Sequence, residues 1–301
     1  MASVRRCREY ALVVRAIAAP AAIVAVFTVA ATGGADASAA RAARLHGQNF
    51  FSNCSFSHIA SDDPIVYPNQ PGVSHSHTFF GSKSTGAAST AETLRASPTT
   101  CRRSADTAAY WVPTLYSGGV AVKPTKGSAY FVLRSRGEMH AFPAGLKIVA
   151  GDAHARAPQP LSKTYWSCSM AEGIRWRTPH SCSTRRRGGS LPFFGSNRKS
   201  LLQLDVFFPD CWDGRRLDSP DHRSHMAYSR NWTCPRSHPV KVPRLRFIVT
   251  YPIQSPKELR LASGGIYSAH ADFFNGWHQK AFTRLVADCF VYRPRCNAPP
   301  K

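Results

Sequence analysis

Hydrophobic and β-branched positions along the chain predict a protein built mainly from strands. The runs combine aromatic and branched residues, partly in alternation with polar ones, as half-buried or buried strands do. They cover residues 109–117, 128–135, 146–152, 200–212 and 244–252. Turn sequences rich in Gly, Pro, Asn and Asp separate them, which favours a β-rich domain with long loops.

Two stretches have a helical pattern instead. Residues 90–97 form a short one. Residues 276–290 form a longer one, in which apolar residues recur at three- and four-residue steps: Trp277, Ala281, Phe282, Leu285, Val286 and Cys289. We therefore expect a mainly β fold, β-sandwich-like or irregular α+β, with a C-terminal helix.

The N-terminal segment is typical of a secretory signal peptide. Four arginines precede an apolar run over residues 16–32, and small residues follow it. The alternative is a single membrane anchor. The apolar run over residues 16–32 is shorter than the roughly 20 residues that a spanning helix usually needs. We predict a signal peptide over 1–40, a single domain over 41–301, and a secreted protein. No second long apolar run occurs, so no stable membrane span is expected after cleavage.

Cysteine usage agrees with export. Nine cysteines occur, and Cys7 lies in the predicted signal peptide. An even number in an exported chain indicates disulfides, although eight cysteines allow about 105 connectivities. Sequential pairing is the connectivity that we expect. The eight are Cys54, Cys101, Cys168, Cys182, Cys211, Cys234, Cys289 and Cys296.

The charge of the chain is strongly positive. Residues 41–301 carry 35 Lys and Arg against 15 Asp and Glu, and such an excess attracts polyanions. No nucleic-acid-binding module accompanies it, so we predict a polysaccharide or an anionic wall polymer as the partner rather than a specific nucleic acid. Common nucleotide-binding and hydrolase motifs are also absent from the sequence. Asp and His therefore remain as the candidate chemical groups.

The first candidate motif is GVSHSHTFFGS, residues 72–82. His75 and His77 are two apart, so an extended segment points them to the same side. Two imidazoles arranged in this way suit one metal ion or one substrate. Two solvated loop histidines are the alternative.

The second motif is DSPDHRSHMAY, residues 218–228. Asp218, Asp221, His222 and His225 are predicted to be catalytic, with the two carboxylates as acid and base. His222 and His225 are three apart, so one helical turn would place them on one face. The alternative is that both aspartates are turn or capping residues beside Pro220.

The third motif is GGIYSAHADFFNGWH, residues 264–278. His270 and Asp272 are side by side on an extended chain, with Asp272 as a distant catalytic partner and His270 as a substrate-binding residue. Trp212 and Trp277 are predicted to be sugar-stacking residues, and a core position is the alternative for Trp277.

These motifs together resemble the DUF1996 family, a domain of unknown function in secreted fungal and bacterial proteins. The resemblance covers roughly residues 60–289 and adds AYWVPTLY, AFPAGLKIVAGD and CPRSHPVKVPRL to the three motifs. Fungal members often carry WSC modules, which are associated with carbohydrate, and this implies an extracellular, wall-facing role. Fungal relatives end their last motif with an acid, where this chain has His278.

The function that we predict is that of a secreted carbohydrate-active enzyme on a cell-wall or extracellular polysaccharide. Two carboxylates flanking a glycosidic bond favour hydrolysis, and a lyase acting on an acidic polymer would use the same groups. His75 and His77 are predicted to bind substrate. An alternative is a divalent-metal site formed by His75, His77, His222 and His225. Another is a non-catalytic, disulfide-stapled wall-binding module.

Overall fold

The computed structural model describes residues 49–135, 137–169, 173–182 and 199–292. The chain divides into two compact units, Met1–Arg41 and Ala42–Lys301. The predicted signal peptide lies outside the described residues. Within the described ranges, no helix is both long and apolar enough to cross a membrane.

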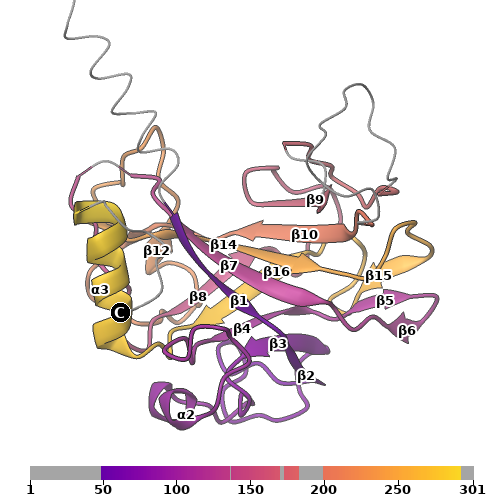
Figure 1. Cartoon of the computed structure of the whole chain (residues 1–301), viewed down its shortest axis with the longest axis horizontal. Helices are drawn as coiled ribbons and strands as arrows, with labels where there is room; N and C mark the ends of the chain where they lie inside the picture. The colour runs from indigo at the N-terminus through magenta and orange to yellow at the C-terminus, as the bar shows by residue number, and fades with distance from the viewer. Residues whose placement is uncertain (1–48, 136, 170–172, 183–198, 293–301) are drawn as a thin grey trace, which may run out of the picture. The chain divides into compact units, whose positions relative to one another are not determined.

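Two five-stranded antiparallel sheets dominate the second unit (Figure 1). The first sheet has the order β1 (Asn49–Cys54), β7 (Lys126–Val132), β14 (Arg244–Thr250), β10 (Leu202–Phe207) and β9 (Thr164–Cys168). The second has the order β2 (Phe56–Ala60), β3 (His77–Gly81), β4 (Ala109–Pro113), β16 (His270–Phe274) and β8 (Lys147–Gly151). Neighbouring strands in each sheet come from distant parts of the chain, so most of the fold depends on non-local pairing.

The main hydrophobic core lies between these two sheets. Phe247 of β14 stacks on Tyr110 of β4 at a ring-centroid distance of 5.3 Å and meets Phe80 of β3 edge-on at 5.4 Å. Gly127 of β7 makes room for this contact, because a Cβ there would lie 2.7 Å from Phe247 Cζ. The arrangement confirms the expected mainly β, sandwich-like fold.

Smaller elements complete the unit. One three-stranded sheet joins β12 (Met226–Ala227), β11 (Cys211–Trp212) and β13 (Val240–Lys241). Another joins β15 (Leu259–Leu261), β5 (Leu115–Ser117) and β6 (Val120–Ala121). The predicted run 109–117 is thus two strands in different sheets, and the run 200–212 divides in the same way.

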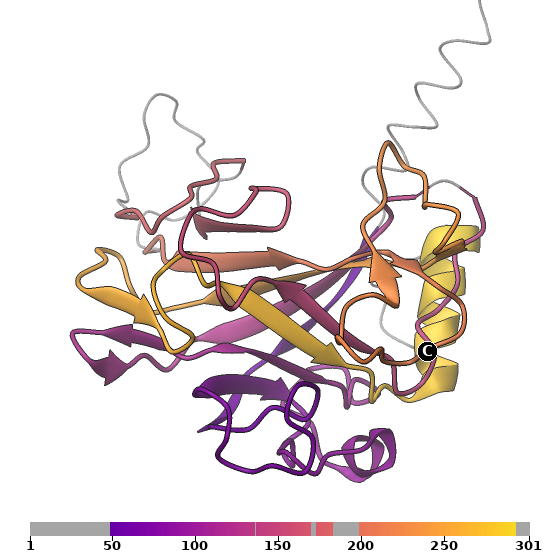
Figure 2. The ribbon, with the colours of Figure 1, turned by 180° about the vertical axis from the view of Figure 1, so that it is seen from behind.

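Both predicted helices are present. The short helix α2 (Ala91–Ala96) begins after Thr90, which caps it through a reciprocal hydrogen bond with Thr93. The C-terminal helix α3 (Gln279–Val286) continues into a π-helical segment, η1 (Ala287–Tyr292), and lies at one end of the two large sheets (Figures 1 and 2). Phe282 fixes α3 there by packing on Phe50 and Phe142.

Three of the four expected disulfides are confirmed. They join Cys54 to Cys101, Cys168 to Cys182, and Cys211 to Cys234. Cys289 is also disulfide-bonded. Cys296, its expected partner, lies outside the described residues.

Candidate metal centre

The outer face of the second large sheet carries three of the predicted site residues. Alternation along β16 sends Ala271 and Phe273 into the main core, so His270 and Asp272 point to the other face. His77 of β3 lies on the same face, and β4 separates the two histidine-bearing strands. His77, His270 and Asp272 are at most 3 % exposed.

Three imidazoles meet on this face. His270 Nε2 lies 3.2 Å from His75 Nε2 and 3.4 Å from His77 Nε2. The rings of His75 and His77 are 4.2 Å apart between centroids, which agrees with the spacing argument for the H-x-H pair. We call His75, His77 and His270 the histidine group.

Backbone carbonyls fix the tautomers of the two buried histidines. His77 Nδ1 donates to the carbonyl of Asp62 and His270 Nδ1 donates to the carbonyl of Ser268, each at 2.9 Å. A carbonyl oxygen can only accept, so in the neutral rings both Nε2 atoms carry lone pairs. This is the ring orientation that carbonyl partners impose on metal-ligating histidines. Two lone pairs that face each other at 3.4 Å repel, and a cation bound between them would remove that repulsion.

The environment keeps these rings neutral. Burial lowers the pKa of His77 well below its usual value, and the neighbouring His270 and His75 lower it further. Burial lowers the pKa of His270 to about 3, and it also lowers the pKa of the half-buried His75. Neutral imidazole is the form that binds metal ions.

Asp272 adds a carboxylate to the same place. Its Oδ2 lies 3.8 Å from His270 Nε2, and neither carboxylate oxygen accepts a hydrogen bond from any described residue. Burial raises the pKa of Asp272 well above its usual value, and Asp63 raises it further. A buried carboxylate without partners is costly, and a bound cation would offset that cost.

Asp63 is the site residue that the sequence did not reveal. It is 4 % exposed, and ligand atoms of Asp63, His77 and Asp272 lie within 4.8 Å of one another. Its Oδ1 accepts hydrogen bonds from the amides of Ile65 and Val66. In sequence it is an ordinary turn aspartate before Pro64, so only the fold identifies it.

The loop of the second motif lies near Asp63 but does not join the histidine group. Burial raises the pKa of Asp63, whereas hydrogen bonds from the amides of Val66 and Ile65 and the charges of His222 and Lys147 lower it. His222 Nδ1 donates to Asp218 at 3.0 Å. His225 Nε2 donates to the carbonyl of Lys147 at 2.7 Å, and its Nδ1 lies 2.9 Å from Ser219 Oγ.

Of the four histidines in the predicted metal set, the structure brings together His75 and His77, and it joins His270 to them. Both ring nitrogens of His225 have partners within the protein, and His222 pairs with a carboxylate of its own loop. His270, which we predicted to bind substrate, takes the third place in the group. The physical reason is strand order: β3 and β16 are brought close by β4, a pairing that local spacing cannot reveal.

The two aspartates of this loop have structural partners. Asp221 accepts hydrogen bonds from Ser219 Oγ and from the amides of Ser224 and Arg223, and these turn contacts, that from Ser219 first, lower its pKa. Asp218 bonds His222 and lies 3.6 Å from Lys147 Nζ. The turn interpretation of these residues fits the geometry better than a paired acid and base.

The two tryptophans have different surroundings. Trp277 has no exposed surface, and its indole N–H donates to the Tyr110 hydroxyl. It belongs to the core, so it offers no face for stacking on a sugar. Trp212 is half-buried and donates to the carbonyl of Arg216 at 2.6 Å.

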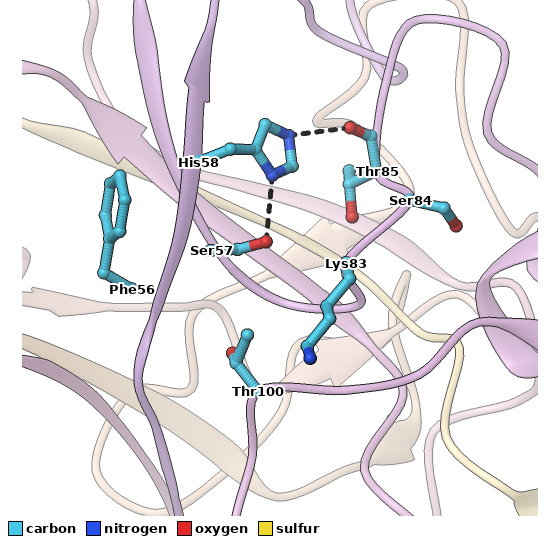
Figure 3. A pocket seen from close by; sticks show the side chains of 7 residues that line it. All are labelled: Phe56, Ser57, His58, Lys83, Ser84, Thr85 and Thr100. Carbon is cyan, nitrogen blue, oxygen red and sulfur yellow. Dashed lines mark hydrogen bonds between the residues drawn. The ribbon is translucent and has the colours of Figure 1, made fainter.

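A separate polar pocket of about 560 Å³ lies beside β2. Figure 3 shows His58 held between the Ser57 hydroxyl and the Thr85 carbonyl. Both of its ring nitrogens are thereby engaged, so the pocket offers amine and hydroxyl groups rather than a free imidazole. Its lining is Phe56, Ser57, His58, Lys83, Ser84, Thr85 and Thr100.

Comparison with known proteins gives one match. The family model described as "Domain of unknown function (DUF1996)" matches residues 63–277. This range begins at Asp63 and includes every member of the histidine group. No curated protein and no solved structure matches the chain.

Proposed function

Because the chain belongs to the DUF1996 family, whose description names no activity, we propose a function from its own site: it binds a divalent transition-metal ion. The proposed ligands are His75, His77, His270 and Asp272. The observation that carries this proposal is the pair of Nε2 lone pairs that the carbonyls of Asp62 and Ser268 aim at each other.

The chemistry of the proposed ligands restricts which metal ion can bind. Three imidazole nitrogens and one carboxylate suit Zn²⁺ or Cu²⁺, whereas Ca²⁺ and Mg²⁺ prefer oxygen ligands. His75 is half-buried while the other three ligands are buried, so one side of the centre faces solvent. A three-histidine centre with an open side is typical of catalytic rather than structural zinc.

Metal content and ligand substitution test this proposal directly. Residues 41–301, produced in an oxidising compartment, should contain about one ion per chain by elemental analysis. His77→Ala and His270→Ala should each weaken metal binding by more than about 100-fold, because even outer partners of metal ligands cost about 10- to 100-fold. His140→Ala is the matched control, since His140 is exposed and its amide donates to the carbonyl of Lys241 in β13, which belongs to a different sheet.

Equal metal content in all three variants would reject the proposed ligands. Circular dichroism and unfolding curves must accompany the comparison, because His77 and His270 are buried. Asp272→Asn adds a test that keeps the side-chain volume and removes only the carboxylate charge.

We further propose that the centre acts on an extracellular polysaccharide. The net positive charge of residues 41–301 supports an acidic polymer, and the hydroxyl-lined pocket beside Phe56 offers room for a polar ligand. Asp218 and Asp221 are engaged in their loop, so in this proposal they are not the bond-breaking groups. A bound metal ion supplies Lewis acidity for that purpose.

A panel of neutral and acidic polysaccharides tests this second proposal. Metal-loaded protein should release oligosaccharides that mass spectrometry detects, and an unsaturated end would identify elimination. Product that is lost in His270→Ala and kept in His140→Ala would support the metal centre as the active site. Retention of polymer without product would favour a wall-binding module instead.

A further inference from the structure

Arg223 is anchored at the edge of the histidine group. Its Nη1 donates to the carbonyl of Gly151 at 2.8 Å, and Gly151 of β8 is the register partner of His270 on β16. The backbones are tightly packed there, because a Cβ on Gly151, whose φ is +80°, would lie 2.5 Å from the carbonyl oxygen of Ala269. The guanidinium is therefore held beside the strand that bears two proposed ligands.

The positive charge of Arg223 lies beside a proposed ligand, because the carbonyl that holds its guanidinium belongs to the residue paired with His270 in the sheet. The neighbouring acid does not neutralise it by an ion pair: Asp152 Oδ1 accepts a hydrogen bond from the amide of His154 in a turn.

Arg223 has no acidic partner among the described residues. Arg216, Arg244 and Arg246 each pair with an aspartate. Arg223 is exposed, and the hydrogen bond that its guanidinium makes goes to a neutral carbonyl. A guanidinium carries five N–H donors in a planar fork that matches carboxylate and phosphate oxygens. Most of this donor capacity is available to a ligand at the open side of the centre.

We propose that Arg223 forms an oxyanion subsite beside the metal centre, so that the ligand of this protein carries an anionic group, as an acidic sugar does. This inference rests on the proposed metal-binding function. Arg223 positions the anionic group of the ligand, while the metal centre binds a neighbouring oxygen. The half-buried His75 and the exposed His154, which together mark the solvent side of the group, leave this approach open.

Arg223→Gln tests the subsite, with Arg215→Gln as its control. Arg215 is an exposed arginine of the same loop that forms no ion pair within the described residues, so its substitution changes the net charge equally. Calorimetry on the zinc-loaded proteins would measure binding of inorganic phosphate, galacturonate, trigalacturonate and galactose. Zinc affinity itself would come from competition with a chelator.

We expect Arg223→Gln to weaken binding of galacturonate by about 10- to 100-fold, as loss of hydrogen bonds to a charged group does. Its zinc affinity should stay within about tenfold of the wild type, because Arg223 is not a ligand. Arg215→Gln should bind galacturonate and zinc with the same affinities as the wild type. Trigalacturonate bound more tightly than phosphate would identify a polymer as the source of the anion, and the reverse order would identify a free oxyanion.

Two failures are distinguishable. A wild type that binds neither zinc nor copper rejects the proposed function and the subsite together. A wild type that binds zinc overturns the subsite alone if galactose binds as well as galacturonate, if no anionic probe binds, or if Arg223→Gln binds the anionic probes unchanged.

Discussion

Buried carboxylates in this protein fall into two classes that differ in their partners. Asp205 and Asp210 each pair with an arginine. Burial raises the pKa of Asp106 and of Asp272, and the carboxylate of Asp272 accepts no hydrogen bond from any described residue. Asp272 faces the histidine group, whereas Asp106 accepts hydrogen bonds from the Tyr110 hydroxyl inside the core. Asp272 is therefore a candidate metal ligand, whereas Asp106 is a buried acid of the core.

The raised pKa of Asp106, about 7 in the folded protein, predicts a pH-dependent stability. The folded state binds this proton more tightly than the unfolded chain, so the stabilisation is complete below about pH 4. It is lost as the pH rises to about 7, by on the order of 4 kcal/mol. Asp106→Asn should remove this part of the slope. Urea unfolding at pH values from 4 to 8 measures the free energy of unfolding of the wild type and of Asp106→Asn. If that free energy changed with pH in the same way for both proteins, Asp106 would not be the source of the pH dependence.

Local spacing predicted pairs of site residues but not how the pairs combine. His75 with His77, and His270 with Asp272, lie together because residues two apart on an extended chain share a side. Nothing in the sequence says that β4 pairs with both β3 and β16. The sequence therefore did not indicate that His270 rather than the histidines of residues 218–228 lies beside His75 and His77, and it did not indicate Asp63.

The sequence pattern predicted which segments are strands or helices more accurately than it predicted where each one begins and ends. The predicted run 244–252 is β14, and 146–152 is β8. The predicted helix 276–290 begins at Gln279, since Trp277 precedes it in the core. Periodicity indicates which face of a strand is buried, but the break at Thr114, which divides residues 109–117 between two sheets, has no hydrophobic signature.

The contact between the two large sheets depends on a glycine in β7. A Cβ at Gly127 would lie 2.7 Å from Phe247 and 2.9 Å from Phe80. Gly127→Ala should therefore lower the free energy of unfolding by about 1–3 kcal/mol through overpacking. Gly265→Ala is the control, because a Cβ there meets no atom within 4 Å. Denaturant unfolding compares them, and an equal effect of the two substitutions would argue against tight packing at Gly127.

At the scale of the whole molecule, the proposed metal would link distant parts of the fold. His77 and His270 are 193 residues apart in sequence, and the strands that bear them belong to one sheet. An ion bound only by the folded state stabilises it according to its concentration.

Zinc at about 100 times its dissociation constant should raise the free energy of unfolding by about 2.7 kcal/mol. Thermal unfolding with zinc and with a chelator measures this difference. His270→Ala should unfold at the same temperature under both conditions, while His140→Ala should respond as the wild type does. A zinc effect that persists in His270→Ala would place the ion elsewhere.

The separation of the ligands along the chain also sets an order of events. A partly synthesised or truncated chain that ends before β16 holds His75 and His77 but neither His270 nor Asp272. Such a chain can offer only half of the centre, and the backbone carbonyls that orient the rings act only once the sheet has formed. Only a chain that is fully synthesised and folded would then acquire its metal ion. Metal binding would be the last step of maturation and would not direct early folding.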